Sequence, residues 1–244
     1  MHIGLRRIFF IGPILICISA FLGCGHSRTV AALVEADSLM WTRPDSSLAL
    51  VQSVSPDTLD DENRAYHALL LTQAQFRNNI YPDTDTIINR ALDFYADNHN
   101  RERLTRSLIY KGLVYEVNVK PADAMAWYLK AEENADSMDV KNRAYIFLRK
   151  GVLYCEYFSK YHEDIHNFKK ALFLYEKLGY VQQQIFCLSK IGGLYREYYP
   201  DTAITYLSRG LSLAYEVKDT TMAFLLEEYI ARMNIHLNLN SATL

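Results

Sequence analysis

The chain has 244 residues, and its 26 lysines and arginines stand against 28 aspartates and glutamates, which gives a formal net charge of −2. A protein that binds a nucleic-acid duplex normally carries a basic field on its surface. This balance of charge therefore argues against a nucleic-acid partner.

The first two dozen residues have the character of an export signal and not of a folded domain. A basic head at Arg6 and Arg7 precedes the apolar run 8–22, which is too short and too near the terminus for an ordinary membrane span. The run leads into Gly23 and Cys24, a pair that resembles a bacterial lipoprotein cleavage site with Cys24 as the lipidated residue. We expect a signal peptide over 1–23, a short tether over 24–29 and one folded domain over 30–244, with ordinary secretion or an uncleaved anchor as the alternatives.

Apolar runs of helical period fill the rest of the chain, and no stretch alternates with period two for long enough to predict a strand. Pro44, Pro82, Pro121 and Pro200 stand where new helices should begin, because a proline at the first helical position loses no needed hydrogen bond. We expect helices over 30–41, 44–54, 61–79, 84–97, 101–118, 121–137, 140–159, 162–178, 180–198, 200–217 and 219–237.

Three glycines recur inside these helices at a nearly fixed interval. Gly112, Gly151 and Gly192 are 39 and 41 residues apart, and each is followed three residues later by a tyrosine. A period of this length is the mark of a helical repeat array. In that register Cys155 and Cys187 lie on adjacent helices but are staggered by more than a disulfide can span, so we expect two unpaired, mostly buried thiols.

These positions resemble the tetratricopeptide repeat (TPR) over nearly all of the chain after the first thirty residues. The family carries a small residue and then an aromatic one in the first helix of each repeat, helix A. It carries a second small residue in helix B, which Ala131, Ala171 and Gly210 match. The resemblance implies an all-α fold, a right-handed TPR-like α-solenoid of about five helix pairs plus one unpaired C-terminal helix. Together with its leader, the chain resembles TPR lipoproteins of the Bacteroidetes type.

The resemblance also implies where a partner would bind. In this family a concave groove, lined by helix A positions, holds a peptide or another protein. Arginine side chains suit carboxylates, so the expected guest is an acidic segment or a free C-terminus. The alternative is that these positions are merely solvated. Carried onto this chain, the groove residues are Arg77, Asn78, Arg106, Tyr110, Glu116, Tyr145, Arg149, Lys190 and Arg196.

One short motif invites a catalytic interpretation. The segment from His162 to His166 has the pattern H-E-x-x-H, which in zinc peptidases places two imidazoles on one helical face. The repeat register favours a structural role instead, with His162 at the start of a helix B, Ile165 in the helix contact and His166 near an exposed face. We therefore expect no metal, no other cofactor, no catalytic residue and no enzymatic activity.

The eighteen tyrosines could suggest carbohydrate stacking, but many, such as Tyr115, Tyr154 and Tyr195, fall at helix-contact positions. The function that we expect is a lipid-anchored scaffold that binds a protein or peptide. Its expected location is the cell envelope, on the outer membrane, facing the periplasm or the cell surface. The alternatives are the N-terminal sensory part of a larger TPR signalling protein, or a glycan-capture lipoprotein.

The last predicted helix, 219–237, has the pattern of a helix A without its helix B. A solenoid normally closes with a polar capping helix, so this helix should leave residues such as Leu225, Leu226 and Ile230 exposed. We therefore expect either a truncated member of a longer family or a terminus covered by another chain, most simply a second copy in a homo-oligomer.

Overall fold

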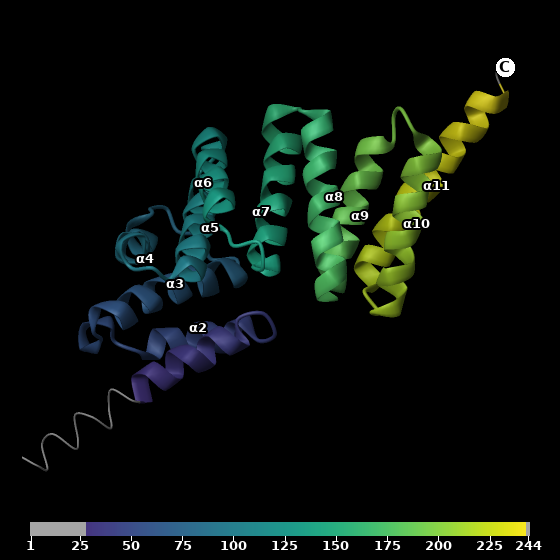
Figure 1. Ribbon diagram of the computed structural model, residues 1–244. Helices are drawn as coiled ribbons and strands as arrows, with labels where there is room; N and C mark the ends of the chain where they lie inside the picture. Colours follow the sequence, from purple (N-terminus) through teal and green to yellow (C-terminus); the bar gives the residue numbers. More distant parts are fainter. Residues whose placement is uncertain (1–27, 243–244) are drawn as a thin grey trace, which may run out of the picture. The chain divides into compact units, whose positions relative to one another are not determined.

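The computed structural model describes residues 28–242, and over that range every regular element is helical (Figure 1). The predicted leader and Cys24 lie outside the described residues. Within them, no helix combines the length and the apolar character that a bilayer crossing requires. The all-α fold class predicted from the sequence is confirmed.

The helix boundaries follow the predicted ones closely. Pro44, Pro121 and Pro200 each begin a helix, as expected. Pro82 does not, since it lies in the loop before α4, which begins at Thr86. Gly179, with a φ of +67°, ends one in the left-handed conformation that glycine adopts without strain. The helices are 28–39, α2 (Pro44–Ser53), the 3-10 turn η1 (Pro56–Thr58), α3 (Asp61–Arg77), α4 (Thr86–Asp97), α5 (Arg101–Val117), α6 (Pro121–Asn134), α7 (Val140–Leu153), the π-helical turn η2 (Tyr154–Phe158), α8 (Tyr161–Leu178), α9 (Val181–Tyr195), α10 (Pro200–Glu216) and α11 (Thr220–Ala242).

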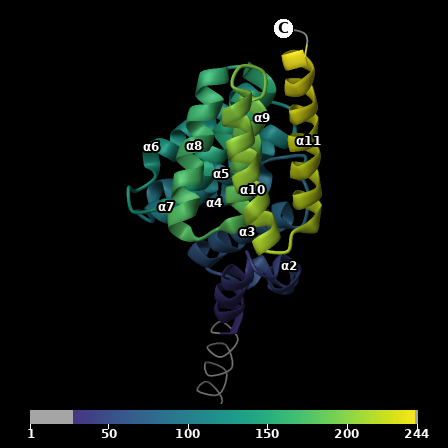
Figure 2. The ribbon, with the colours of Figure 1, turned by 90° about the vertical axis from the view of Figure 1, so that its right-hand side faces the viewer.

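The chain divides into two compact units, which we call unit 1 and unit 2, at the junction of Val117 and Asn118. In unit 1, α3 packs against α2, α4 and α5. In unit 2, which runs from α6 to α11, neighbouring helices in the sequence pack against each other. Figure 2 shows α11 running along α10. Each unit is thus built from neighbouring helices that are adjacent in sequence, which is the construction of a helical repeat protein.

Glycines mark the closest helix contacts of unit 2. A methyl group added at Gly192 would lie 2.6 Å from Cγ of Leu207 on α10, and one at Gly151 would lie 3.0 Å from the ring of Phe168 on α8. Real side chains essentially never approach as closely as 2.6 Å, and 3.0 Å is tighter than most real contacts, so the backbone of one helix sits directly against a side chain of the next. This is the contact that the repeat register predicts for these two glycines.

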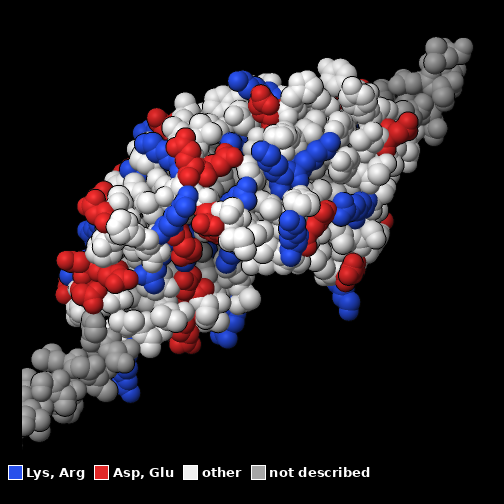
Figure 3. All heavy atoms as spheres, viewed as in Figure 1, with Lys and Arg blue, Asp and Glu red and all other residues white. Residues whose placement is uncertain are grey.

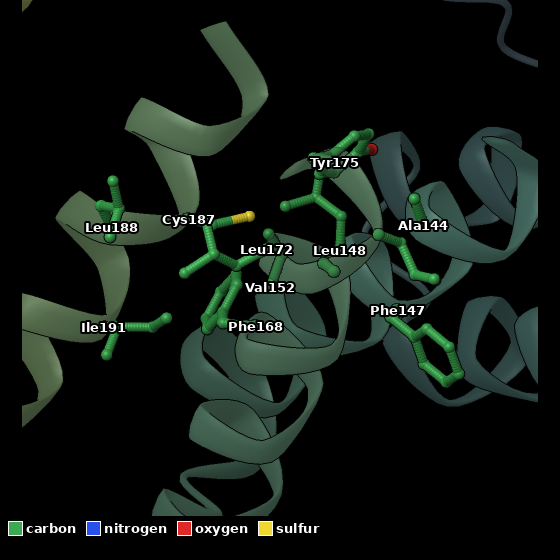
Figure 4. Packing of buried hydrophobic residues seen from close by; sticks show 12 residues of the cluster. Ala144, Phe147, Leu148, Val152, Phe168, Leu172, Tyr175, Cys187, Leu188 and Ile191 are labelled. Carbon is green, nitrogen blue, oxygen red and sulfur yellow. The ribbon is translucent and has the colours of Figure 1, made fainter. Parts of the chain in front are cut away.

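The core of unit 2 lies between α7, α8 and α9 (Figure 4). Phe168 and Cys187 are fully buried in it. Burial raises the pKa of the Cys187 thiol to about 12. Cys155 is half-buried at the edge of the same cluster, and both thiols are free.

The last helix corrects one expectation from the sequence. Leu226 is only 1% exposed, because α11 turns the stripe that contains it toward α10. Leu225 is exposed as predicted, and Ile230 is half-buried. Phe224, which the sequence analysis did not single out, is 66% exposed. The expectation that Leu226 would be exposed was therefore wrong.

Candidate functional site

A buried ion pair joins three helices of unit 1. Arg106 on α5 is 9% exposed, and its two terminal nitrogens donate to the carboxylate of Asp37 at 2.8 and 3.0 Å. The same guanidinium donates to Oε1 of Gln73 on α3 at 2.5 Å. The hydroxyl of Tyr66 donates to Asp37 at 2.6 Å. The group is a tightly bonded polar network and not an open binding site.

The electrostatics of this network keep Arg106 charged. Burial by itself would lower the pKa of Arg106, but the hydrogen bonds and the charge of Asp37 raise it above its ordinary value. Burial, together with the hydrogen bond to Asp37, also raises the pKa of Tyr66. The resemblance implied that Arg106 faces a ligand groove, whereas the structure places it in an internal pair with a carboxylate 69 residues away.

Arg77, at the end of α3, is a cation of a different kind. Its guanidinium carbon lies 4.4 Å from the ring centroid of Trp41, a cation–π contact. Among the described residues no carboxylate pairs with Arg77, and its Nε is buried without a hydrogen-bond acceptor. Buried donors are nearly always satisfied, so an unpaired one calls for an explanation.

Tyr110 on α5 lies close to this arginine. Its ring centroid is 6.0 Å from that of Phe76, the residue before Arg77. Burial raises the pKa of Tyr110, while the charges of Arg106 and Arg77 act in the opposite direction. Within the part of the chain that the structure describes, the Tyr110 hydroxyl makes no hydrogen bond. The structure therefore brings together two of the predicted groove residues, Arg77 and Tyr110.

The other predicted residues of unit 1 have structural surroundings. The amide nitrogen of Asn78 donates to the carbonyl oxygens of Pro44 and Ala74 at 2.8 and 2.7 Å, which fixes the end of α3 against the start of α2. Glu116 on α5 is 8% exposed. Asn78 thus has a structural role in joining α2 and α3.

In unit 2 the predicted groove residues come from α7 and α9. Lys190 lies 3.4 Å from the carboxylate of Glu156 and 5.5 Å from the ring centroid of Phe186. Arg196 is exposed and within 3.9 Å of Glu197. Lys190 and Arg196 thus each have a carboxylate partner on the surface, and such pairs contribute little to stability. The remaining two, Tyr145 and Arg149, are half-buried on α7.

The H-E-x-x-H segment lies on the first turns of α8. His162 and His166 are exposed, whereas Ile165 is buried, as the repeat register predicted. No third histidine, cysteine, aspartate or glutamate of the described chain joins the two imidazoles in a group that could hold a metal ion. The residues present do not form the ligand set that a zinc peptidase requires.

The surface charges of the molecule are mixed. On the face drawn in Figure 3, lysine and arginine side chains alternate with aspartates and glutamates and do not gather into a field of one sign. Recognition on this face would therefore depend on individual side chains and not on a broad potential.

Sequence reasoning missed Asp37, Tyr66 and Trp41 as partners of the arginines. Asp37 is far from Arg106 in sequence, and no local pattern marks it. Trp41 is one of only two tryptophans, and this rarity is the one signal that could have drawn attention to it.

Fold and helix contacts together define a TPR-like helical repeat protein. Neither a protein-family model nor a curated protein matches the sequence. Among solved structures, the chain is similar to a signal transduction ATPase with numerous domains from Pyrococcus horikoshii, which has a tetratricopeptide repeat sensor. The two share 13% identity, with a TM-score of 0.69, and the match covers 88% of this chain and 34% of that one. It is also similar to a Rap protein complexed with competence and sporulation factor, with 15% identity and a TM-score of 0.63 over 87% of this chain and 62% of that one.

A third similar structure is BtubC from P. vanneervenii, with 15% identity and a TM-score of 0.51 over 89% of this chain and 92% of that one. The chain spans about a third of the first of the three structures and less than two thirds of the second. The structural similarity establishes the shared fold, a TPR-like α-solenoid. Sequence identities this low do not establish shared binding partners.

Proposed function

We propose that this protein is a non-catalytic scaffold that binds an acidic segment of a protein or peptide, with Arg77 as the cation that receives a carboxylate. The observation that carries the proposal is the state of Arg77. It is held against Trp41, it has no carboxylate partner among the described residues, and its Nε is buried without an acceptor.

Physical chemistry favours a carboxylate at this position. A buried N–H group without an acceptor costs roughly 1–3 kcal/mol. A carboxylate that accepts from the terminal nitrogens of Arg77 would form a charge-assisted hydrogen bond, and the stacking on Trp41 already limits the orientations of the guanidinium plane. Tyr110, whose hydroxyl is unbonded within the described residues, adds a neutral donor nearby. Two similar structures are described as a sensor and as a complex with a factor, which supports a binding role.

The first prediction tests Arg77. Charge reversal in the variant Arg77→Glu should abolish capture of an acidic partner from a membrane extract, because a carboxylate would then face a carboxylate. The measurement is quantitative mass spectrometry of proteins retained by the immobilised chain, followed by direct titration of the retained partner. The thermal midpoint should fall only modestly, because the variant loses the cation–π contact with Trp41 and places a negative charge in the last turn of α3, but breaks no ion pair of the described chain.

Arg90→Glu is the matched control for this variant. Arg90 is exposed on α4 in the same unit, so its reversal makes the same change of net charge away from Trp41 and Tyr110. Equal loss of partner in both variants would show a general charge effect. Full retention of the partner by Arg77→Glu would refute the proposed role of Arg77.

We further propose that the scaffold is anchored to the outer membrane of a bacterial cell envelope through a lipid on Cys24, as in TPR lipoproteins of the Bacteroidetes type. The support is the basic head and apolar run before Gly23 and Cys24 in the sequence. An anchored scaffold would hold its partner near the membrane.

The second prediction concerns this anchor. Cys24→Ser should block lipid attachment and move the protein from the membrane to the soluble fraction, because a hydroxyl does not form the thioether that the lipid requires. Metabolic labelling with a fatty-acid analogue and fractionation measure the two effects. Unchanged labelling and membrane association in Cys24→Ser would exclude a lipoprotein, while Cys17→Ser should behave as the unaltered chain.

A sensory role is the second candidate. It is favoured by the similarity to a protein whose tetratricopeptide repeats are described as a sensor, of which this chain spans 34%. Such a role uses the same partner-binding surface and would need an output segment beyond the residues described.

A further inference from the structure

A second surface of the protein, in unit 2, carries tyrosines that are largely exposed to solvent. Tyr198 and Tyr199, in the turn between α9 and α10, are 70% and 57% exposed. Tyr198 makes an edge contact with Tyr161 at the start of α8, with ring centroids 5.9 Å apart. Tyr199 makes the same kind of contact with Tyr195 at 5.8 Å. We call these four residues the tyrosine surface.

The inner tyrosine of this surface, Tyr195, already has contact partners within the protein. Tyr195 stacks on Tyr206 of α10, with ring centroids 5.8 Å apart. Nζ of Lys169 donates to the Tyr195 hydroxyl at 2.9 Å and lies 5.2 Å from the centre of that ring. The protein's own ammonium group therefore occupies the position that a cationic ligand would take among these rings.

The two outer tyrosines, Tyr198 and Tyr199, are open to a ligand. Within the described residues the hydroxyls of Tyr198 and Tyr199 make no hydrogen bond, and most of each side chain faces solvent. A ligand would thus meet two apolar rings with free hydroxyl donors at their tips. Aromatic side chains presented in this way are the commonest anchors of protein recognition.

The adjoining turn departs from the repeat pattern at the same place. The segment Tyr154–Phe158 is π-helical, a rare conformation that is often found at functional sites. Ser159 follows with a φ of 48°, a left-handed conformation that Asn79 and Val119 also adopt in the corresponding turns of the preceding repeats. Tyr161 then occupies the helix start where Pro121 and Pro200 stand in other repeats, and its hydroxyl is buried without a partner. Among the described residues, the π-helical turn and the unbonded Tyr161 hydroxyl are thus the two features that distinguish this turn.

The charges around the surface do not select a charged ligand. Basic and acidic side chains surround it in similar numbers, all of them exposed: Lys160, Glu163, Arg196, Glu197 and Asp201. The ligand that fits is therefore neutral, apolar in its side chains and able to accept hydrogen bonds.

From this combination we infer that the tyrosine surface binds a proline-rich segment of a partner protein in the polyproline II conformation. Proline rings pack against aromatic rings, and a polyproline II chain leaves its carbonyl oxygens unpaired, ready to accept from tyrosine hydroxyls. The segment is already extended in solution, so little conformational entropy is lost on binding. The inference is independent of the role proposed for Arg77 in unit 1.

The test measures the fluorescence anisotropy of a labelled decaproline peptide titrated with the purified full-length chain. Saturable binding is expected, and a Gly-Ser peptide of equal length should not bind. Tyr198→Ala and Tyr199→Ala should each weaken decaproline binding about tenfold or more, the usual effect of truncating an aromatic anchor. The double variant Tyr198→Phe with Tyr199→Phe keeps the rings and should show a smaller loss, because only the hydroxyl donors are removed.

Tyr229→Ala is the matched control, because Tyr229 on α11 is 43% exposed and lies outside the tyrosine surface. It should bind decaproline as the unaltered chain does, and so should Arg77→Glu. Circular dichroism of all variants checks that the fold is kept. The inference is overturned by lack of saturable binding, by equal binding of the Gly-Ser peptide, by unchanged affinity in the two alanine variants, or by binding of a neutral oligosaccharide in place of decaproline.

Discussion

Asp37→Ala is expected to lower the free energy of unfolding of unit 1 by about 3 kcal/mol, because it removes the carboxylate that holds both terminal nitrogens of the buried Arg106 and leaves only a weaker surface partner. The carboxylate accepts two hydrogen bonds from Arg106 and one from Tyr66. After the substitution, the nearest remaining carboxylate is that of Glu102, which is 3.4 Å from Arg106 and half-exposed. Urea unfolding followed by circular dichroism measures the change.

Asp61→Ala is the control for this prediction. It removes a carboxylate from the same unit that pairs with Arg64, and this carboxylate side chain is 83% exposed. The loss there should be at most about 1 kcal/mol. The double variant Asp37→Leu with Arg106→Met should lose less than Asp37→Ala, since no unpaired charge remains. Similar small losses for Asp37→Ala and Asp61→Ala would contradict the burial of the network.

The second large effect is expected at Gly192. Gly192→Ala should destabilise unit 2 by about 1–3 kcal/mol, because the added methyl group overlaps Cγ of Leu207 and approaches the carbonyl oxygen of Ala203 at 3.2 Å. A backbone oxygen cannot rotate away as a side chain can, so α9 and α10 would have to separate. Thermal or urea unfolding measures the loss.

The neighbouring residue offers an opposite expectation. A methyl group added at Gly193 meets nothing within 4 Å. Gly193→Ala should therefore stabilise α9 by about 0.5–1 kcal/mol, the ordinary gain of alanine over glycine inside a helix. The sign of the effect should thus change between two adjacent glycines. The same sign in both variants would show that Leu207 does not lie against Gly192 as the structure has it.

The helices and their contacts could be predicted from the sequence because they depend on local chemistry. Proline fixes its own φ angle, which is why Pro44, Pro121 and Pro200 located helix starts correctly. The small residues Gly151 and Gly192 located close helix contacts, since only a missing side chain permits them. One boundary was less predictable. The helix expected over 140–159 is α-helical only to Leu153, because an apolar stripe does not reveal a π-helical turn.

The candidate site was less predictable because it depends on long-range partners. The position of Arg106 in its repeat indicated an exposed groove residue. Its side chain is instead buried, because it pairs with Asp37 on a helix that is distant in the sequence. Leu226 was expected to be exposed because an apolar helix surface does not reveal which stripe its neighbour covers. Arg77 lacks a carboxylate partner among the described residues, and this could only be seen once the side chains were assembled. Its role, like that of Lys190 and Arg196, stays a prediction.

Because Cys187 is deeply buried, the rate at which its thiol reacts measures the opening of unit 2. A thiol is alkylated through its thiolate, and burial that raises the pKa to about 12 leaves almost no thiolate at neutral pH. Reaction therefore requires transient separation of α7, α8 and α9, so its rate follows local unfolding of that core. The described residues of unit 1 contain no cysteine. Thiol labelling thus resolves the stability of unit 2 separately from that of unit 1 in a single intact chain.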